Sequence, residues 1–144
     1  MARIQIQVLI DDSSRLHLQD AGGVIIFRQG AEEARTEYLL ADYWLMQLID
    51  GFNQAKKKAL GLLGDGNSEV WVDFTEDRNS VGIQIAGPRV VINFGDVLFK
   101  TNLAEFEVEL RKAIQEFVIH FRDDKQYDKV PSYQVLEKFI VGEE

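Results

Sequence analysis

Residues 70–94 read VWVDFTEDRNSVGIQIAGPRVVINF, and this stretch decides the fold class. Apolar and polar residues alternate in three short runs, 70–74, 81–85 and 90–94, with the period of a β-strand. Turn-forming residues separate the runs. Parallel pairing would need crossovers of about a dozen residues or more. The stretch therefore predicts an antiparallel meander of three strands.

The N-terminal third shows the same alternation. Residues 4–10 alternate almost strictly, and the alternation resumes at 15–19 after a run of turn residues, which predicts a hairpin. Residues 24–27 predict a third strand. Residues 36–40 predict a fourth, joined through a polar loop at 29–33. Because Ala31 to Arg35 are good helix formers, that loop could instead begin a helix.

Two amphipathic helices separate and follow the strands. The first is predicted to begin at Asp42 as its N-cap and to end before the glycine-rich residues 64–67. The second is predicted to begin near Asn102, with Glu105 in a capping-box-like arrangement three residues on. The tail at 133–140 fits a short docked helix better than a final strand.

These elements predict a single globular domain over residues 1–144. The length of 144 residues suits one domain, and a 46% hydrophobic composition is enough to build one core. The predicted fold is α+β, an antiparallel sheet of about six to seven strands with two long amphipathic helices packed on it.

Composition excludes several classes of protein. The chain has no cysteine, so disulfides and thiolate metal sites are absent. No apolar run approaches the roughly 20 residues of a membrane span, and the polar start does not resemble a signal peptide, so we expect a cytoplasmic protein. A net charge of −8 disfavours nucleic acid and anionic membranes and favours a basic protein partner. Solubility alone would also explain an acidic balance.

The inventory of reactive side chains points away from an enzyme. His17 and His120 are the only histidines, and neither has ligand or nucleophile partners at a recognisable spacing. The glycine-rich residues 61–66 lack the Gly-Lys-Ser/Thr of a phosphate-binding loop and follow a predicted helix where that loop follows a strand. We therefore predict no catalytic residue, no metal site and no cofactor.

The candidate contact residues are Trp71, Asp73, Glu76 and Asp77, which share one predicted strand and its turn. If the alternation holds, Trp71 lies opposite Val70 and Val72 on the outer face of the sheet, where aromatic residues favour interfaces. A helix covering that face would instead place Trp71 in the core. The three carboxylates are also typical of a solvated turn.

The overall order of elements resembles a known class. Several N-terminal strands precede a helix containing Tyr-Trp-Leu-Met-Gln-Leu-Ile (residues 43–49), then a meander, then a helix ending in Phe-Val-Ile-His-Phe (residues 117–121). Over residues 3–122 this layout resembles small acidic bacterial immunity proteins of polymorphic and contact-dependent toxin systems. The resemblance implies a non-catalytic protein that binds a toxin domain and occludes its active site or substrate surface. The alternative is a ligand-binding or enzymatic α+β domain with a pocket that the sequence does not reveal.

Overall fold

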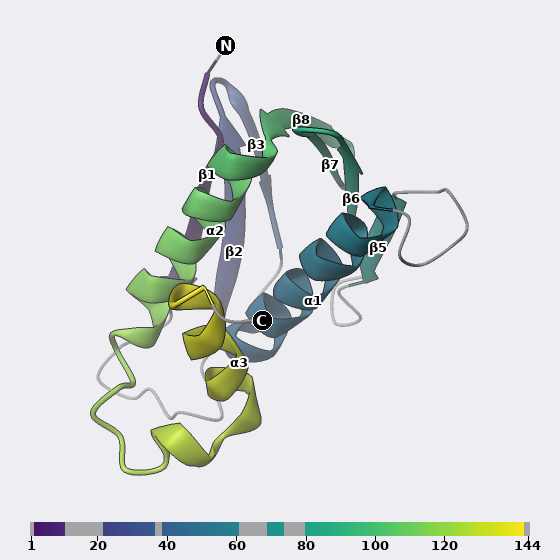
Figure 1. The fold of residues 1–144 in the computed structure, drawn as a ribbon. Helices are drawn as coiled ribbons and strands as arrows, with labels where there is room; N and C mark the ends of the chain where they lie inside the picture. Colours follow the sequence, from purple (N-terminus) through teal and green to yellow (C-terminus); the bar gives the residue numbers. More distant parts are fainter. Residues whose placement is uncertain (1, 11–21, 37–38, 61–68, 74–79, 143–144) are drawn as a thin grey trace.

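The computed structural model describes residues 2–10, 22–36, 39–60, 69–73 and 80–142, with the backbone alone described for Leu39 and Glu69–Asp73. Figure 1 shows the arrangement of the elements. In chain order they are β1 (Gln5–Ile10), β2 (Gly22–Gln29), β3 (Glu32–Arg35), β4 (Leu39–Leu40), α1 (Ala41–Ala59), β5 (Glu69–Asp73), β6 (Ser80–Ala86), β7 (Arg89–Phe94), β8 (Val97–Asn102), α2 (Leu103–Val118), a 3-10 turn (Tyr127–Lys129) and α3 (Pro131–Ile140). The predicted strand at 15–19 lies outside the described residues.

The first sheet, β1 to β4, is built around β2. Strand β1 pairs with one edge of β2, and β3 and then β4 pair with the other, all antiparallel. Between β3 and β4, Thr36 bridges the interruption: its N–H donates to the Ile25 carbonyl and its hydroxyl accepts from the Ile25 N–H, each at 3.0 Å. Strands β3 and β4 thus behave as one interrupted strand.

The predicted loop at 29–33 and the predicted fourth strand at 36–40 need correction. The chain turns through only Gly30 and Ala31, and Gln29 already pairs with Glu32. Gly30 has φ of 61°, a conformation that glycine adopts without steric cost and that suits a two-residue hairpin. The strand therefore begins at Glu32, and the alternative of a helix at Ala31 to Arg35 is wrong.

The second sheet has the order β5-β6-β7-β8 and is antiparallel throughout. The predicted three-strand meander is confirmed, and β8 extends it by a strand that the pattern analysis did not predict. The turns into β7 and β8 contain Gly87 and Gly95, with φ of 61° and 57°. Gly95-Asp96 between two apolar runs is a recognised hairpin signal, so β8 was detectable from sequence.

The strands do not form the predicted single sheet of six to seven strands. In the described part of the chain they form two sheets whose apolar faces meet in one core, together with three α-helices, of which the C-terminal one is the shortest. Phe27 of β2 is fully buried, and its ring lies 5.3 Å from that of Phe94 and 6.0 Å from that of Phe99, both in the second sheet. Each sheet thus covers part of the other's apolar face, while α1 packs on β5 and β6 and α2 packs on β1.

The helix ends confirm one predicted cap and correct another. Asn102 caps α2, and its side-chain oxygen accepts from the Glu105 N–H at 2.8 Å. Asp42 is not the cap of α1, because that helix begins at Ala41. Asp42 is instead buried in the first turn, where its Oδ2 accepts from the Ser132 hydroxyl of α3 at 2.7 Å. The predicted C-terminal helix is confirmed as α3.

Within the described ranges no helix combines the length and apolar character needed to cross a bilayer.

Candidate binding surface

Two of the four predicted contact residues lie in β5, the edge strand of the second sheet. Trp71 stands opposite Gly82 in the register, and Asp73 stands opposite Ser80. Their side chains, and the whole of Glu76 and Asp77, lie outside the described residues. That these four residues form one contact surface stays a prediction.

The sheet that β5 borders has a bare outer face. Along β7 and β8 the more buried residues alternate with the more exposed ones, as expected for a sheet covered on one side. In β6 the alternation is interrupted, because Gly82 is buried between Val81 and Ile83. The register brings the outward residues into cross-strand rows: Gln84 with Val91 and Lys100, Gly82 with Asn93 and Leu98, and Ala86 with Arg89 and Asn102. On this face Leu98 keeps 47% of its surface exposed, and Gln84, Ala86, Arg89, Lys100 and Asn102 are exposed as well, whereas Gly82 is buried.

A groove of about 770 Å³ opens at one end of this sheet. It lies where β7 and β8 meet the start of α2 and the N-terminal segment. Its walls are Ala2, Arg3, Arg89, Val90, Val91, Lys100, Thr101, Asn102 and Glu105. Because neighbouring residues of a strand point to opposite faces, these walls include residues from both sides of the sheet. The charged residues of the wall are three cations, Arg3, Arg89 and Lys100, and one carboxylate, Glu105.

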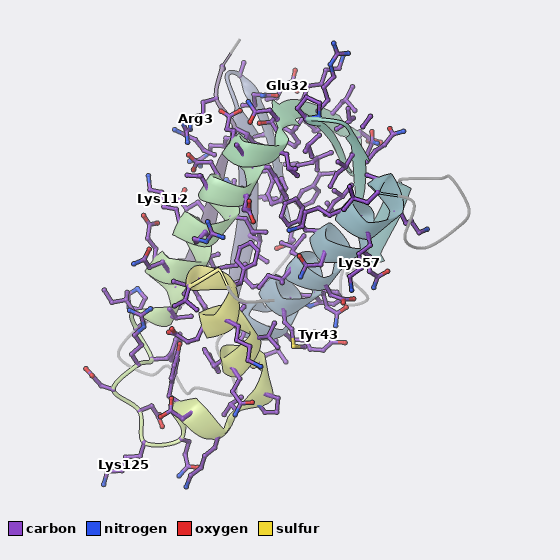
Figure 2. All side chains as sticks on the ribbon, viewed as in Figure 1. Arg3, Glu32, Tyr43, Lys57, Lys112 and Lys125 are labelled. Atoms are coloured by element: carbon purple, nitrogen blue, oxygen red, sulfur yellow. The ribbon has the colours of Figure 1, made fainter. Side chains whose placement is uncertain are left out.

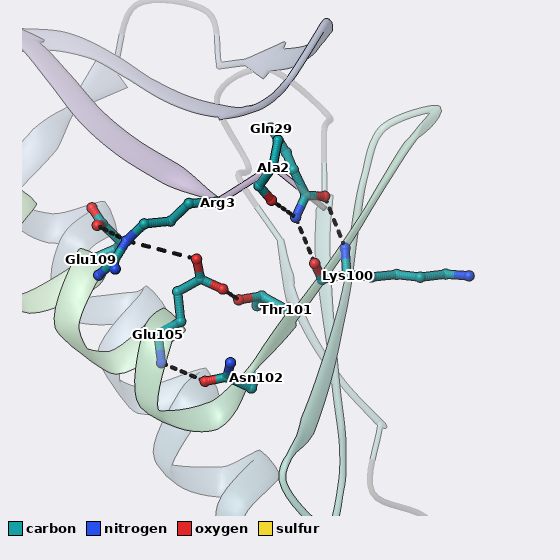
Figure 3. Close-up of polar contacts among 8 residues, drawn as sticks. All are labelled: Ala2, Arg3, Gln29, Lys100, Thr101, Asn102, Glu105 and Glu109. Carbon is teal, nitrogen blue, oxygen red and sulfur yellow. Dashed lines mark hydrogen bonds and ion pairs between the residues drawn. The ribbon is translucent and has the colours of Figure 1, made fainter.

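One side-chain amide joins the two sheets beside the groove (Figure 3). The Nε2 group of Gln29 donates to the carbonyl oxygens of Ala2 and Lys100, at 3.1 and 2.6 Å. Its Oε1 accepts from the Lys100 N–H at 3.2 Å. The amide thus makes the pair of hydrogen bonds that a neighbouring strand would make, and it closes the edge of β8 at this position.

The charges on the α2 side of the groove are largely balanced. Arg3 Nε lies 2.9 Å from Glu109 Oε1 and 3.7 Å from Glu105 Oε1. The Thr101 hydroxyl donates to the other oxygen of Glu105. Figure 3 shows Arg3 directed toward these carboxylates and the Lys100 side chain extending away from them.

The charges on the outer side of the groove are not balanced. Arg89 and Lys100 are both exposed, and among the residues that the structure describes neither has a carboxylate within ion-pair distance. Pattern analysis missed these two cations because each stands alone in its strand. The sequence does contain a signal for them: Arg89 and Lys100 belong to two consecutive strand-like runs, 89–94 and 97–102. A short hairpin between these runs brings the two cations close together.

A polar cluster at the other end of the molecule joins the end of α2 to α3. Glu137 accepts from the Tyr127 hydroxyl at 2.6 Å and from Arg122 Nε at 2.8 Å. Burial raises the pKa of Tyr127, with the Glu137 hydrogen bond adding to this. Burial alone would raise the pKa of Glu137, but the bonds from Tyr127 and Arg122 outweigh it and lower that pKa. These contacts stabilise the helix junction.

The other residues considered for chemistry add no site. His120 is exposed at the end of α2. His17 and the glycine-rich residues 61–66 lie outside the described part of the chain. Over the described residues, no group of three or more histidine or acidic side chains is placed to hold a metal ion. No known protein family, curated protein or solved structure matches the chain.

Proposed function

We propose that this is a non-catalytic binding protein of the cytoplasm, an immunity protein that neutralises a bacterial toxin by binding a basic toxin domain. The observation that carries the proposal is the β5 edge of the second sheet, which holds Trp71 and Asp73 and is the edge opposite β8 with Lys100. The strands of this sheet are fixed from behind by fully buried Val81, Ile83 and Ile92. A surface held rigid in this way loses little conformational entropy when a partner binds.

The distribution of charge supports a basic partner near β5. Residues 61–79, which include β5, contain five acidic residues and only Arg78 as a base. A net negative segment of this kind steers a basic protein toward the edge of the second sheet.

Kinetic measurements on a captured partner test the proposal. The partner would be isolated by pull-down from the source-cell lysate and identified by mass spectrometry, and its association measured at several salt concentrations. Charge reversal of Asp73, Glu76 and Asp77 should slow association, and the effect should shrink as salt rises, because charges are screened over about 8 Å at physiological ionic strength. Trp71→Ala should mainly speed dissociation, as expected for an anchor residue.

The matched control is Asp128→Lys, an exposed charge reversal in the turn before α3. It should leave both rates nearly unchanged. If association is indifferent to salt and to the four substitutions, the proposed surface is wrong. If the purified protein turns over a small molecule, and activity is lost when carboxylates of a pocket are replaced, the alternative of an enzymatic α+β domain replaces the proposal.

A further inference from the structure

We propose that the groove at the end of the second sheet binds a small organic anion, with a carboxylate or phosphate group held between Arg89 and Lys100. This site is separate from the β5 edge and does not depend on the proposed toxin partner. It rests on the cations, the hydrogen-bond donors and the shape of the groove.

The first argument is the arrangement of the two cations. Arg89 pairs with Asn102 and Lys100 pairs with Val91, so the two cations occupy diagonal positions on the same face of adjacent strands. Such positions lie roughly 7–8 Å apart, within reach of two long side chains converging on one anion. Like charges this close repel each other when nothing lies between them. Within the described chain no carboxylate offsets that repulsion.

The second argument is the supply of donors. A guanidinium presents paired N–H groups that match the geometry of a carboxylate or a phosphate. Asn102 stands opposite Arg89, and its Oδ1 is used to cap α2. Its Nδ2 group has no hydrogen-bond partner among the described residues and could donate to a ligand. Two of the first amides of α2 are already used, because the Leu103 N–H bonds to the Pro88 carbonyl and the Glu105 N–H bonds to Asn102.

The carboxylate of Glu105 would repel an anion, but its contacts weaken this effect. One oxygen accepts from Thr101, and the other faces Arg3. Both contacts lie on the α2 side of the groove, whereas Lys100 extends away from that side (Figure 3). Among the described residues, the outer half of the groove thus carries two cations that no carboxylate pairs with, although the protein as a whole is acidic.

The third argument concerns the rest of the ligand. A volume of about 770 Å³ is within the usual range of small-molecule sites, and far exceeds the need of one inorganic ion. Val91, which is half-buried, and Ala2 supply apolar wall beside the cations. The groove therefore suits an anionic head group that carries a short apolar body.

Calorimetric titration at constant ionic strength tests the site. The probes are hexanoate, hexyl phosphate, inorganic phosphate and hexanol. We expect hexanoate or hexyl phosphate to bind more tightly than the other two, and the better of the pair identifies the head group. Arg89→Gln and Lys100→Gln should each weaken binding about fivefold, as expected for loss of a partly exposed ion pair.

The control is Lys125→Gln, which removes an exposed cation that Figure 2 places at the opposite end of the molecule from Arg3. It should leave binding unchanged. All three substitutions are at exposed side chains, and thermal unfolding would verify that each variant folds. The proposal is overturned if no anionic probe binds, if hexanol or inorganic phosphate binds as well as the organic anions, or if Lys125→Gln weakens binding as much as the groove variants do.

Discussion

The outer faces of the two sheets carry similar numbers of cations but differ in whether those cations form ion pairs. On the first sheet, Arg28 lies 2.6 Å from one oxygen of Glu33 and Arg35 lies 3.0 Å from the other. Arg28 also donates to Gln7 at 3.2 Å. Gln7 and Arg35 stand opposite Ile26 in the register, and Ile26 is fully buried although it lies on the outward face. On the second sheet, Arg89 and Lys100 have no such partner among the described residues.

The difference distinguishes charges that serve the fold from charges that are left for a partner. Hydrogen bonds from Arg28 and then Arg35 lower the pKa of Glu33, so that group of charges is internally satisfied. A satisfied group gains little by binding an outside ion. The cations of the second sheet would gain a counter-ion, which is why the groove carries the proposed site.

The largest expected effect comes from removing the contact that both sheets share. Phe27→Ala should reduce the free energy of unfolding by about 3–5 kcal/mol, because it leaves a cavity between β2, β7 and β8. Urea denaturation measures this change. The control Leu98→Ala, on the exposed face, should cost far less. A loss below about 1 kcal/mol for Phe27→Ala would contradict a shared core.

Sequence reasoning predicted most elements here but not their assembly. Alternation located β1, β2, β6 and β7, and spacing located both long helices, because burial on one face imposes those periods directly. Nothing in the period indicates which strands join one sheet. The two sheets meet where Phe27 packs against Phe94 and Phe99, a contact between residues more than sixty positions apart.

The candidate site was less predictable for a similar reason. Asp42 has the chemistry of an N-cap, but packing of α3 against α1 gives it Ser132 as a partner instead. Arg89 and Lys100 look ordinary in sequence, since what makes them notable is that no carboxylate of the described residues lies within ion-pair distance of either. Trp71, Asp73, Glu76 and Asp77 remain the prediction for the protein partner.

The next largest effect is expected from replacing a glycine, and the physical reason for the glycine differs between the two sheets. A Cβ at Gly23 of β2 would lie 2.4 Å from the Leu9 backbone oxygen, so the strands must move apart to admit it. Gly23→Ala should cost about 1–3 kcal/mol of unfolding free energy, as overpacking does. In the second sheet, Gly95 has φ of 57° and nothing within 4 Å of an added Cβ. Gly95→Asn should cost less, because asparagine tolerates that conformation.

A smaller effect is expected from the amide that links the sheets. Gln29→Ala removes the hydrogen bonds to Ala2 and Lys100 and should cost about 1–2 kcal/mol. Hydrogen exchange at the Lys100 amide should accelerate, because its acceptor is lost. The control Gln54→Ala removes one exposed hydrogen bond to Asp50 on α1 and should leave exchange at Lys100 unchanged. Unchanged exchange in Gln29→Ala would show that the edge of β8 is closed by other groups.

The smallest effect tests the charges themselves. The folded-state pKa of Glu33 is lowered from 4.5, so its stabilising contribution is present above that pH and is lost as the pH falls through the folded pKa. Glu33→Gln should therefore lower the melting temperature slightly at pH 7 and low salt. The gap to the unsubstituted protein should close both at acid pH and in concentrated salt, because the pair is exposed. Arg89→Gln should not lower the melting temperature at pH 7, since it breaks no ion pair within the described part of the chain and relieves repulsion from Lys100. If Arg89→Gln destabilises as much as Glu33→Gln, then Arg89 serves the fold, and the contrast between the two faces fails.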